Sequence, residues 1–540
     1  MTPTRWACVV AAVGVAVYLL LDPHSPDFAA QQYRVALAGH DAFGLWDNGW
    51  FAGHHLPGYS LVFPQLGALV GMRVAGGLAA LAASALFARL AQRHWGDRAA
   101  TIAGAWFAIG ATSMLLSGRL TFMLGVAIGL ASLLALQGER HVGAAALALL
   151  TSLASPVAGL FVAMAAVAWG LAGSGRTRWA RAAVLAAAAA APIAATSALF
   201  PEGGTEPFVG SSFRPAIVLI VLVLVVLPTR ERTLRIATAL YALGCVAAFA
   251  LATPLGGNVT RLGALAAGPV VAGALLAGGR ASRAPQSGTR QASAWAAFWS
   301  EAAAGGWRNT VLLVTLALPL AFWQAGSGVR DAVDASGDPS TQASYYAPLA
   351  RFLRSRPGSF RAEIPFTANH WEAAYVAPSI PLAGGWERQL DRRYGALLYD
   401  GSLTPSSYRA WLDDSAVAYV ALPDVPLDYS SEAEARMIQR GLPYLRPVWH
   451  DAHWRVFAVR RPAPMVRGAG ATITLQTGGF TLRARRTGDA FVRVHDTRWW
   501  AVTSGRGCVA AGPDGMTRVR VLAPGTIRVR ARLLGSACRR

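Results

Sequence analysis

The sequence predicts an α-helical polytopic membrane bundle, followed by an extracytoplasmic α/β domain and a small β-sandwich. Apolar residues make up 54% of the 540 residues and charged residues only 14%, whereas soluble proteins average about 25% charged residues. Nearly all long apolar runs fall in residues 1–324, and residues 325–540 have the composition of a globular protein. The predicted domains are a transmembrane bundle (1–324, with an outer loop at 22–73), an α/β domain (325–462) and a β-sandwich (463–540).

About 11 membrane helices are expected, since a span needs about 20 apolar residues, or somewhat fewer inside a bundle. The first apolar run lacks a small-x-small cleavage site before Asp22, so we expect an uncleaved first helix. Residues 142–172 are too many for one helix and are broken at Ser155-Pro156, which predicts a broken hairpin of 142–154 and 157–172. The other predicted spans are 5–21, 74–93, 99–116, 120–137, 178–199, 214–228, 233–252, 262–278 and 309–324.

Every basic residue is arginine, and the arginines cluster at alternate ends of the apolar runs. The positive-inside rule then places the amino terminus in the cytoplasm and the carboxy-terminal domain outside, in a multi-pass protein of the cell inner (plasma) membrane. The net charge of +21 does not indicate nucleic acid as a partner, because the arginines flank apolar runs. Membrane lipids are the expected partners of these arginines.

Outside the spans, the pattern predicts short elements. Residues 27–38 are expected to form a helix along the membrane interface, and 279–308 a linker with an amphipathic patch. Helices are expected at 343–355, 405–413 and 430–440, and strands at 361–364, 417–422 and 454–459. After residue 470, short alternating runs separated by turns predict a β-sandwich. An outer location permits a disulfide between Cys508 and Cys538, although the sequence leaves their pairing open.

The first candidate cluster is Asp22, Asp27, Gln31 and Arg34. On a helix, positions 27, 31 and 34 share one face. A carboxylate partly desolvated there can act as a general base toward a hydroxyl. The alternative is structural, with Ser25 or Asp27 capping the start of the helix.

The second cluster lies in residues 45–64, which hold Trp46, Asp47, Trp50, His54, His55 and Tyr59. Aromatic rings with histidine and aspartate are typical of sugar-binding surfaces, and are equally typical of an interfacial aromatic belt. Adjacent histidines point in different directions on a regular element, so no metal site is expected.

The third cluster consists of Arg119 and Arg261, with Arg73 nearby, at predicted outer helix ends. Arginine is disfavoured there, so these residues suggest a function. A guanidinium group binds phosphate in a bidentate manner, which makes a lipid phosphate one partner and an outer carboxylate such as Glu202 the other. The fourth cluster, in residues 383–401, includes Trp386, Glu387 and Arg388. It indicates either a carbohydrate or lipid-headgroup surface or a docking face.

An early outer acid, an interfacial helix, a many-span bundle and an outer carboxy-terminal domain together resemble the GT-C superfamily of membrane glycosyltransferases. The motifs PDFAAQQYR, LWDNGWFAGHHLPGYSLVFP, SGRLTFMLG, SPVAGLF, GGNVTRLG and GGWERQLD also look like those of polytopic bacterial proteins labelled "6-pyruvoyl-tetrahydropterin synthase-related". Pterin synthase chemistry would need a three-histidine zinc site, and the sequence has no H-x-H spacing.

The GT-C resemblance implies that Asp27 is the catalytic acid and that the donor is a polyprenyl-phosphate-linked sugar. Asp27 would deprotonate a hydroxyl of an envelope glycan or lipid acceptor, which attacks the anomeric carbon with inversion and needs no cofactor. Arg34, Arg119 or Arg261 would stabilise the departing phosphate. The family often has paired acids, whereas here Phe28 follows Asp27, so Asp22 remains a second candidate.

Two other functions remain open. The Ser155-Pro156 break suits a transporter or flippase for a lipid-linked glycan, because interrupted helices often flank transport sites. A non-catalytic envelope scaffold would instead use the outer domain to bind partners or polymer.

Overall fold

The computed structural model describes residues 1–40, 43–277, 307–533 and 538. The chain divides into two compact units. The first, here called the helical unit, comprises Met1–Pro23, Tyr59–Leu199 and Glu206–Val333. The second, the mixed unit, comprises His24–Gly58, Phe200–Thr205 and Asp334–Arg540. The sequence-based division assigned 22–73 to the bundle, whereas most of that loop belongs to the mixed unit.

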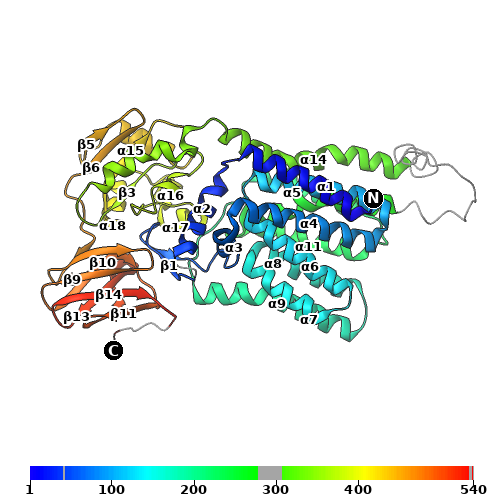
Figure 1. Cartoon of the computed structure of the whole chain (residues 1–540), viewed down its shortest axis with the longest axis horizontal. Coiled ribbons are helices and arrows are strands. Elements are labelled where there is room, and N and C mark those ends of the chain that lie inside the picture. The colour runs from blue at the N-terminus through cyan, green and yellow to red at the C-terminus, as the bar shows by residue number, and fades with distance from the viewer. Residues whose placement is uncertain (41–42, 278–306, 534–537, 539–540) are drawn as a thin grey trace, which may run out of the picture. The chain divides into compact units, whose positions relative to one another are not determined.

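The helical unit consists of helices (Figure 1). Within the described residues, eight helices are long and apolar enough to cross a membrane, and α7, α8 and α10 are shorter apolar helices. The bounds are α1 Pro3–Leu21, α3 Phe63–Val70, α4 Met72–Trp95, α5 Asp97–Leu116, α6 Leu120–Gln137, α7 His141–Ala154, α8 Pro156–Ala172, α9 Arg176–Leu199, α10 Gly210–Val226, α11 Arg232–Ala250, α12 Thr260–Leu276 and α14 Trp307–Ala335, with a 3-10 turn at Gly256–Val259.

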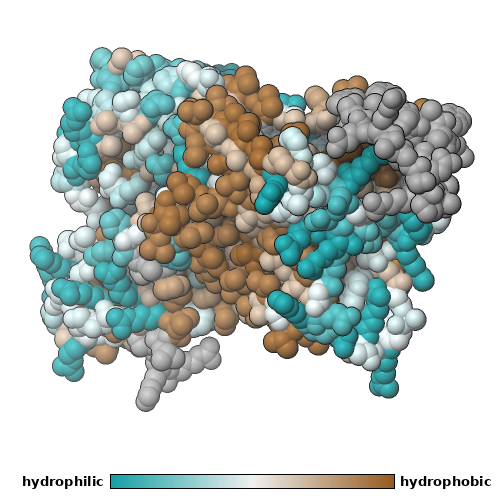
Figure 2. All heavy atoms as spheres, turned by 45° about the vertical axis from the view of Figure 1, so that its right-hand side comes forward, coloured by the Kyte–Doolittle hydropathy of each residue, from teal (hydrophilic) through white to brown (hydrophobic). Residues whose placement is uncertain are grey.

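Small residues allow these helices to pack closely. A Cβ atom on Gly263 of α12 would lie 2.1 Å from the Trp323 ring of α14. Large apolar side chains such as Leu20, Val142 and Leu318 are instead 79% to 87% exposed. Figure 2 shows an extended apolar surface over the bundle. A surface of this kind is stable only when lipid covers it, so the chain is a multi-pass membrane protein.

The predicted break at Ser155-Pro156 is confirmed. Helix α7 ends at Ala154, Ser155 is extended (φ −156°, ψ 110°), and Pro156 starts α8. At the break, two backbone carbonyls at the end of α7 accept hydrogen bonds from the segment that precedes α3. Ser60 Oγ donates to the Ala154 carbonyl (2.7 Å), and Leu61 N donates to the Leu153 carbonyl (2.9 Å). This satisfies the backbone groups that would otherwise be orphaned within the membrane.

In the mixed unit, the loop after α1 forms α2 (Pro26–His40) and a small hairpin of β1 (Trp46–Asp47) and β2 (His54–His55). The hairpin pairs Trp46 with His55 and Asp47 with His54. Asn48 Nδ2 donates to the carbonyls of Gln476 (2.8 Å) and Gly479 (2.7 Å), which joins the loop to the β-sandwich. The helix predicted at 27–38 corresponds to α2, which belongs to the mixed unit.

The α/β part has a four-stranded sheet in the order β3-β4-β6-β5, in which only β3 and β4 pair in parallel. Its core includes Tyr408, Leu412, Val417 and Val420. The strands are β3 Arg361–Glu363, β4 Val417–Pro423, β5 Leu445–His450 and β6 Trp454–Val459; the helices are α15 Ala343–Arg354, α16 Glu372–Tyr375, α17 Arg388–Tyr394, α18 Pro405–Asp414 and α19 Glu432–Gln439, with 3-10 turns at Pro339–Thr341 and Ala396–Leu398.

The β-sandwich consists of two antiparallel sheets with strand orders β12-β13-β10-β7 and β11-β14-β9-β8. Trp46 joins its core beside Trp500 and Phe480. Cys508 and Cys538 form a disulfide, with Cα atoms 4.9 Å apart. The strands are β7 Val466–Arg467, β8 Thr472–Gln476, β9 Gly479–Ala484, β10 Gly488–His495, β11 Trp500–Ser504, β12 Gly507–Ala511, β13 Met516–Val521 and β14 Gly525–Ala531, with a 3-10 turn at Pro513–Gly515.

Most predicted helices and strands agree with the structure to within a few residues. However, α14 extends to Ala335 beyond the span predicted at 309–324, and β1, β2, α3, α16, α17 and β5 are among the elements that were not expected. The predicted linker at 279–308 falls almost entirely outside the described residues.

Candidate functional site

Asp27 lies in the first turn of α2 and is half-buried. Two tryptophans hold this turn, since Trp371 Nε1 donates to the His24 carbonyl (2.8 Å) and Trp386 Nε1 to the Pro26 carbonyl (2.8 Å). These bonds fix the backbone on both sides of Ser25, so Asp27 follows a segment that is held within the mixed unit.

His370 stacks on Trp386, with ring centroids 3.5 Å apart and planes within 7°. Its backbone φ of 57° is in the left-handed region, which is uncommon for a residue other than glycine and often marks a functional position. Its Nε2 lies 3.4 Å from Asp428 Oδ2 and its Nδ1 3.7 Å from Glu372 Oε1. The imidazole ring therefore stands between two carboxyl groups, those of Asp428 and Glu372.

Arg388 completes this group. Its guanidinium donates to both oxygens of Asp428, at 3.0 and 2.8 Å, and to the Tyr399 hydroxyl at 2.9 Å. The same guanidinium lies 5.0 Å from the Trp386 ring centroid. We call Glu372, Trp386, Arg388, Asp428 and His370 the His370 cluster.

Burial sets the charges of the His370 cluster. Burial lowers the pKa of His370, although Asp428 and, more weakly, Asp27 act in the opposite direction. Burial raises the pKa of Glu372 to about 8, which keeps this carboxyl protonated at neutral pH. Burial also raises the pKa of Asp428, but hydrogen bonds from His370 and Arg388 outweigh it and hold the pKa well below the usual range. The cluster thus holds one anion, one cation and a neutral imidazole, and the imidazole is within electrostatic reach of Asp27.

The other residues of the α2 cluster have defined partners. Arg34 forms an ion pair with Glu387, and its guanidinium lies 5.7 Å from the Trp50 ring centroid. Gln31 Nε2 donates to the Asp27 carbonyl at 3.1 Å. Asp22 belongs to the helical unit, where its Oδ1 lies 2.6 Å from Arg73 Nε. The two candidate acids therefore have different settings, and Asp22 closes an ion pair at the end of α1.

The aromatic cluster of the loop is largely internal. Trp46 is 2% exposed in the sandwich core, and Trp50 is fully buried and donates to the Ala373 carbonyl at 3.2 Å. Asp47 accepts hydrogen bonds from the Tyr33 hydroxyl (3.0 Å) and the Gly49 amide (2.9 Å). These side chains account for the rigidity of the loop, and their rings offer little open surface to a sugar.

The adjacent histidines differ. His54 is 1% exposed, and burial lowers its pKa to about 3. His55 is half-buried, its Nδ1 lies 2.5 Å from Glu202 Oε1, and its Nε2 bonds to Thr497 Oγ1 at 2.8 Å. Glu202 also accepts a hydrogen bond from the Tyr394 hydroxyl at 3.2 Å. Among the described residues, no group of three or more His, Cys, Asp or Glu is arranged to hold a metal ion.

In the helical unit, the first turn of α6 brings three predicted residues together. Arg119 immediately precedes α6, and its Nη1 contacts Ser327 Oγ of α14 at 3.3 Å. The Arg261 guanidinium, from the first turn of α12, lies 5.9 Å from the Phe122 ring centroid. The Tyr59 hydroxyl bonds to Thr121 Oγ1 at 3.3 Å. Arg119 thus precedes α6, and Arg261 and Tyr59 contact residues of its first turn; we call these three residues the arginine cluster.

Sequence reasoning missed His370, Glu372 and Asp428. His370 and Glu372 share the stretch NHWEAA (369–374), in which two chemically active residues flank a tryptophan. That local density was a usable signal. Asp428 lies 58 residues after His370 in the sequence, and its approach to the imidazole arises only from the fold.

Comparison with solved structures identifies similar folds. Arabinofuranosyltransferase AftD from Mycobacteria aligns with a TM-score of 0.50 and 16% identity, over 98% of this chain and 60% of that chain. ArnT from Cupriavidus metallidurans aligns in its apo state with a TM-score of 0.47 and 15% identity, over 84% of this chain and 98% of that chain. A second ArnT structure, bound to undecaprenyl phosphate, has a TM-score of 0.42 and 16% identity, over 84% of this chain and 98% of that chain.

No protein-family model matches the chain, and no curated protein matches it. The likeness to AftD shows that this chain has a similar fold. None of these comparisons supports the pterin-synthase label.

Proposed function

We propose that this chain is an integral-membrane glycosyltransferase that moves a sugar from a polyprenyl-phosphate donor to an envelope glycan or lipid acceptor on the outer face. The observation that carries the proposal is the setting of Asp27. It is a half-buried carboxylate on a helix start that two tryptophans hold in place, beside the His370 cluster. The GT-C-like fold supports the same reaction class.

In the proposed reaction, Asp27 accepts the proton of an acceptor hydroxyl as its oxygen attacks the anomeric carbon of the donor sugar. The bond between that carbon and the phosphate oxygen breaks, its electron pair leaves with polyprenyl phosphate, and the configuration inverts. General-base assistance of this kind contributes about 10²–10⁴-fold to a rate. No step requires a redox partner or a cofactor.

We assign the arginine cluster to the phosphate. Its guanidinium groups belong to Arg119, which precedes α6, and to Arg261, which lies near Phe122 in the first turn of α6. Arginine binds phosphate oxygens in a bidentate manner and stabilises the negative charge that grows as the leaving group departs. In the mixed unit, Arg34 is held by Glu387, so its charge is already balanced there.

The proposed location is the inner membrane, with the amino terminus in the cytoplasm and the mixed unit outside. The support is the distribution of arginine, which collects at one side of the helix turns. The disulfide between Cys508 and Cys538 agrees with an oxidising compartment.

Substitution of the two acids tests the assignment. We expect Asp27→Asn to reduce sugar transfer from polyprenyl-phosphate sugar by at least about 100-fold in reconstituted vesicles, because an amide cannot accept the proton. Asp22→Asn is the matched control, since it alters an acid five residues earlier that pairs with Arg73. Retained transfer in Asp27→Asn, with loss in Asp22→Asn, would move the catalytic role to Asp22. Full activity in both variants contradicts the proposal and favours a non-catalytic scaffold.

A further inference from the structure

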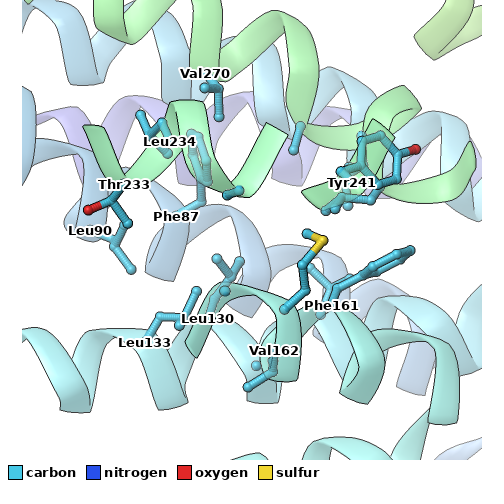
Figure 3. Close-up of a pocket in the computed structure, with 18 of the residues that line it drawn as sticks. Phe87, Leu90, Leu130, Leu133, Phe161, Val162, Thr233, Leu234, Tyr241 and Val270 are labelled. Carbon is cyan, nitrogen blue, oxygen red and sulfur yellow. The ribbon is translucent and has the colours of Figure 1, made fainter. Parts of the chain in front are cut away.

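A cavity of about 580 Å³ lies inside the helical unit. Side chains from α4, α6, α8, α11 and α12 face it, as Figure 3 shows for Phe87, Leu130, Phe161, Leu234 and Val270. Volumes of about 300–1,000 Å³ are typical of sites that enclose a ligand. The cavity belongs to no part of the site described above.

The middle of the cavity presents hydrocarbon. Three hydroxyl groups line the cavity, from Thr233, Thr238 and Tyr241, and those of Thr238 and Tyr241 are engaged within the protein. The Tyr241 hydroxyl donates to the Val259 carbonyl (2.9 Å) and accepts from the Gly263 amide (3.0 Å), and Thr238 Oγ1 donates to the Leu234 carbonyl (2.8 Å). A ligand placed here therefore meets an apolar wall and few available polar atoms, which suits an alkyl chain.

The cavity is elongated. It follows α6 from Gly125 to Gln137, which at about 1.5 Å per residue is about 18 Å. That length is more than half of the hydrocarbon thickness of a bilayer, about 30 Å. An extended lipid chain fits this dimension better than a compact solute does.

The charged residues that line the cavity are at one end. His94 from the last turn of α4, and Arg178 from the first turn of α9, belong to the lining. The Arg178 guanidinium donates twice to the Trp169 carbonyl (2.9 and 2.7 Å) and lies 4.5 Å from the Trp169 ring centroid, and these contacts hold Arg178 in the lining. His94 pairs with Glu231 at 2.8 Å.

Short turns connect α4 to α5, α6 to α7, α8 to α9 and α10 to α11, so these helix ends lie on the same side of the helical unit. Arginine is abundant there and acids are few. Among the described residues, the acids at these ends are Asp97, Glu139 and Glu231, and the arginines are Arg89, Arg93, Arg98, Arg140, Arg176, Arg178, Arg181, Arg230, Arg232 and Arg235. Arginines near a membrane surface attract anionic lipid.

We propose that this cavity binds an anionic membrane phospholipid, with an acyl chain between the helices and the phosphate beside Arg178. The site is separate from the arginine cluster, because Arg119 and Arg261 stand at the starts of α6 and α12, whereas Gln137 and Arg178 mark the opposite side of the unit. The bound lipid fills space between α8, α11 and α12 and thereby stabilises the bundle. The inference goes beyond the proposed function and does not depend on it.

The test uses the full chain in nanodiscs of phosphatidylcholine with about one tenth phosphatidylglycerol, followed by purification in detergent and mass spectrometry of the retained lipid. We expect the unaltered chain to retain phosphatidylglycerol in near-stoichiometric amount. Ala237→Phe fills the cavity and should abolish retention, whereas Ala247→Phe, an exposed position on the same helix, should not.

A second pair of variants tests the headgroup. Arg178→Gln should weaken retention about fivefold, and the exposed Arg181→Gln should have little effect. Equal phosphatidylglycerol retention in Ala237→Phe and Ala247→Phe overturns the proposal, provided that both variants remain monodisperse. Loss of added polyprenyl phosphate from Ala237→Phe, with phosphatidylglycerol unchanged, also overturns it and makes the cavity a donor-chain site.

The two proposals fail separately. Asp27→Asn should lose sugar transfer and keep phosphatidylglycerol, because Asp27 is in the mixed unit and does not line the cavity. If the Asp27→Asn variant keeps its sugar-transfer activity, the result contradicts the proposed function and leaves the lipid proposal unaffected.

Discussion

The helical unit and the mixed unit bury different kinds of side chain. In the helical unit, alanine and glycine fill the contacts between helices, and arginine stands at the helix ends. In the mixed unit, Arg361, Glu363, Glu372, Asp391 and Glu434 are at most 2% exposed. A helix in lipid gains little by burying charge, whereas a soluble fold can support buried charge with hydrogen bonds or change its protonation.

Arg361 illustrates how the mixed unit accommodates a buried charged side chain. Its Nη1 donates to the Ser415 carbonyl (3.0 Å) and the Arg493 carbonyl (2.8 Å), which connects the α/β part to the β-sandwich. The buried carboxyl groups of Asp391 and Glu363 are accommodated by a change in protonation instead, because burial raises the pKa of each well above the usual range. A buried polar network of this kind is specific to one arrangement of the chain.

The largest expected effect concerns an aromatic residue in each unit. Trp46→Ala should destabilise the mixed unit by about 3–5 kcal/mol, because it leaves a cavity beside Trp500. Trp6→Ala, on α1, should cost much less, since the side chain is 45% exposed. Urea unfolding of the full chain in detergent, followed by near-ultraviolet circular dichroism, measures both. An equal loss of stability in the two variants would mean that Trp46 contributes little to the stability of the β-sandwich core.

A glycine pair tests the close packing of the helical unit. Gly263→Ala should destabilise the bundle by about 1–3 kcal/mol, because the added Cβ would meet the Trp323 ring. Gly244→Ala on α11 meets nothing within 4 Å and should be neutral or slightly stabilising, since alanine favours helix. Thermal unfolding in a single detergent compares them. A neutral Gly263→Ala would show that α12 and α14 pack less closely than described.

The smallest effect is the pH dependence of the mixed unit. Glu372 has a folded pKa of about 8 and an ordinary pKa of 4.5, so the unfolded state binds fewer protons between those values. The free energy of unfolding should therefore fall as pH rises, by about 1.4 kcal/mol per unit from this group. We restrict the test to about pH 6.5–8, because burial lowers the pKa of His370, whose contribution opposes that of Glu372 at lower pH.

Glu372→Gln keeps an acceptor for the Thr367 hydroxyl and removes the titration. Thermal unfolding at the two ends of that pH range should then differ less than in the unaltered chain. Glu432→Gln is the control, because Glu432 is 54% exposed and pairs with Arg436 on the same helix. An unchanged pH dependence in Glu372→Gln would mean that Glu372 is ionised in the folded state.

Local patterns predicted most of the elements. The apolar runs indicated the spans, and Ser155-Pro156 indicated the break between α7 and α8. Strand β5 was not predicted, because LRPVWH contains a proline and no clear alternation. Helix α3 was not predicted because Phe63–Val70 is too short to register as a span.

The candidate site was only partly accessible from sequence. Asp27 was identified from the shared helix face of positions 27, 31 and 34 and from the GT-C resemblance, and Arg261 from its position at a predicted outer helix end. The His370 cluster was not, because His370, Arg388 and Asp428 come from three separate segments. Contacts of this range leave no local periodicity in the chain.

The sequence by itself determined the membrane-spanning character, the break in the hairpin and the change to β structure after residue 470. Hydropathy and turn residues act over a few neighbours, so they can be recognised without coordinates. The tertiary structure alone decided that residues 24–58 fold with the carboxy-terminal domains, that Trp46 enters the β-sandwich, and that Arg261 of α12 lies near Phe122 of α6. These outcomes depend on burial and hydrogen bonding between segments far apart in the chain, which no local pattern encodes.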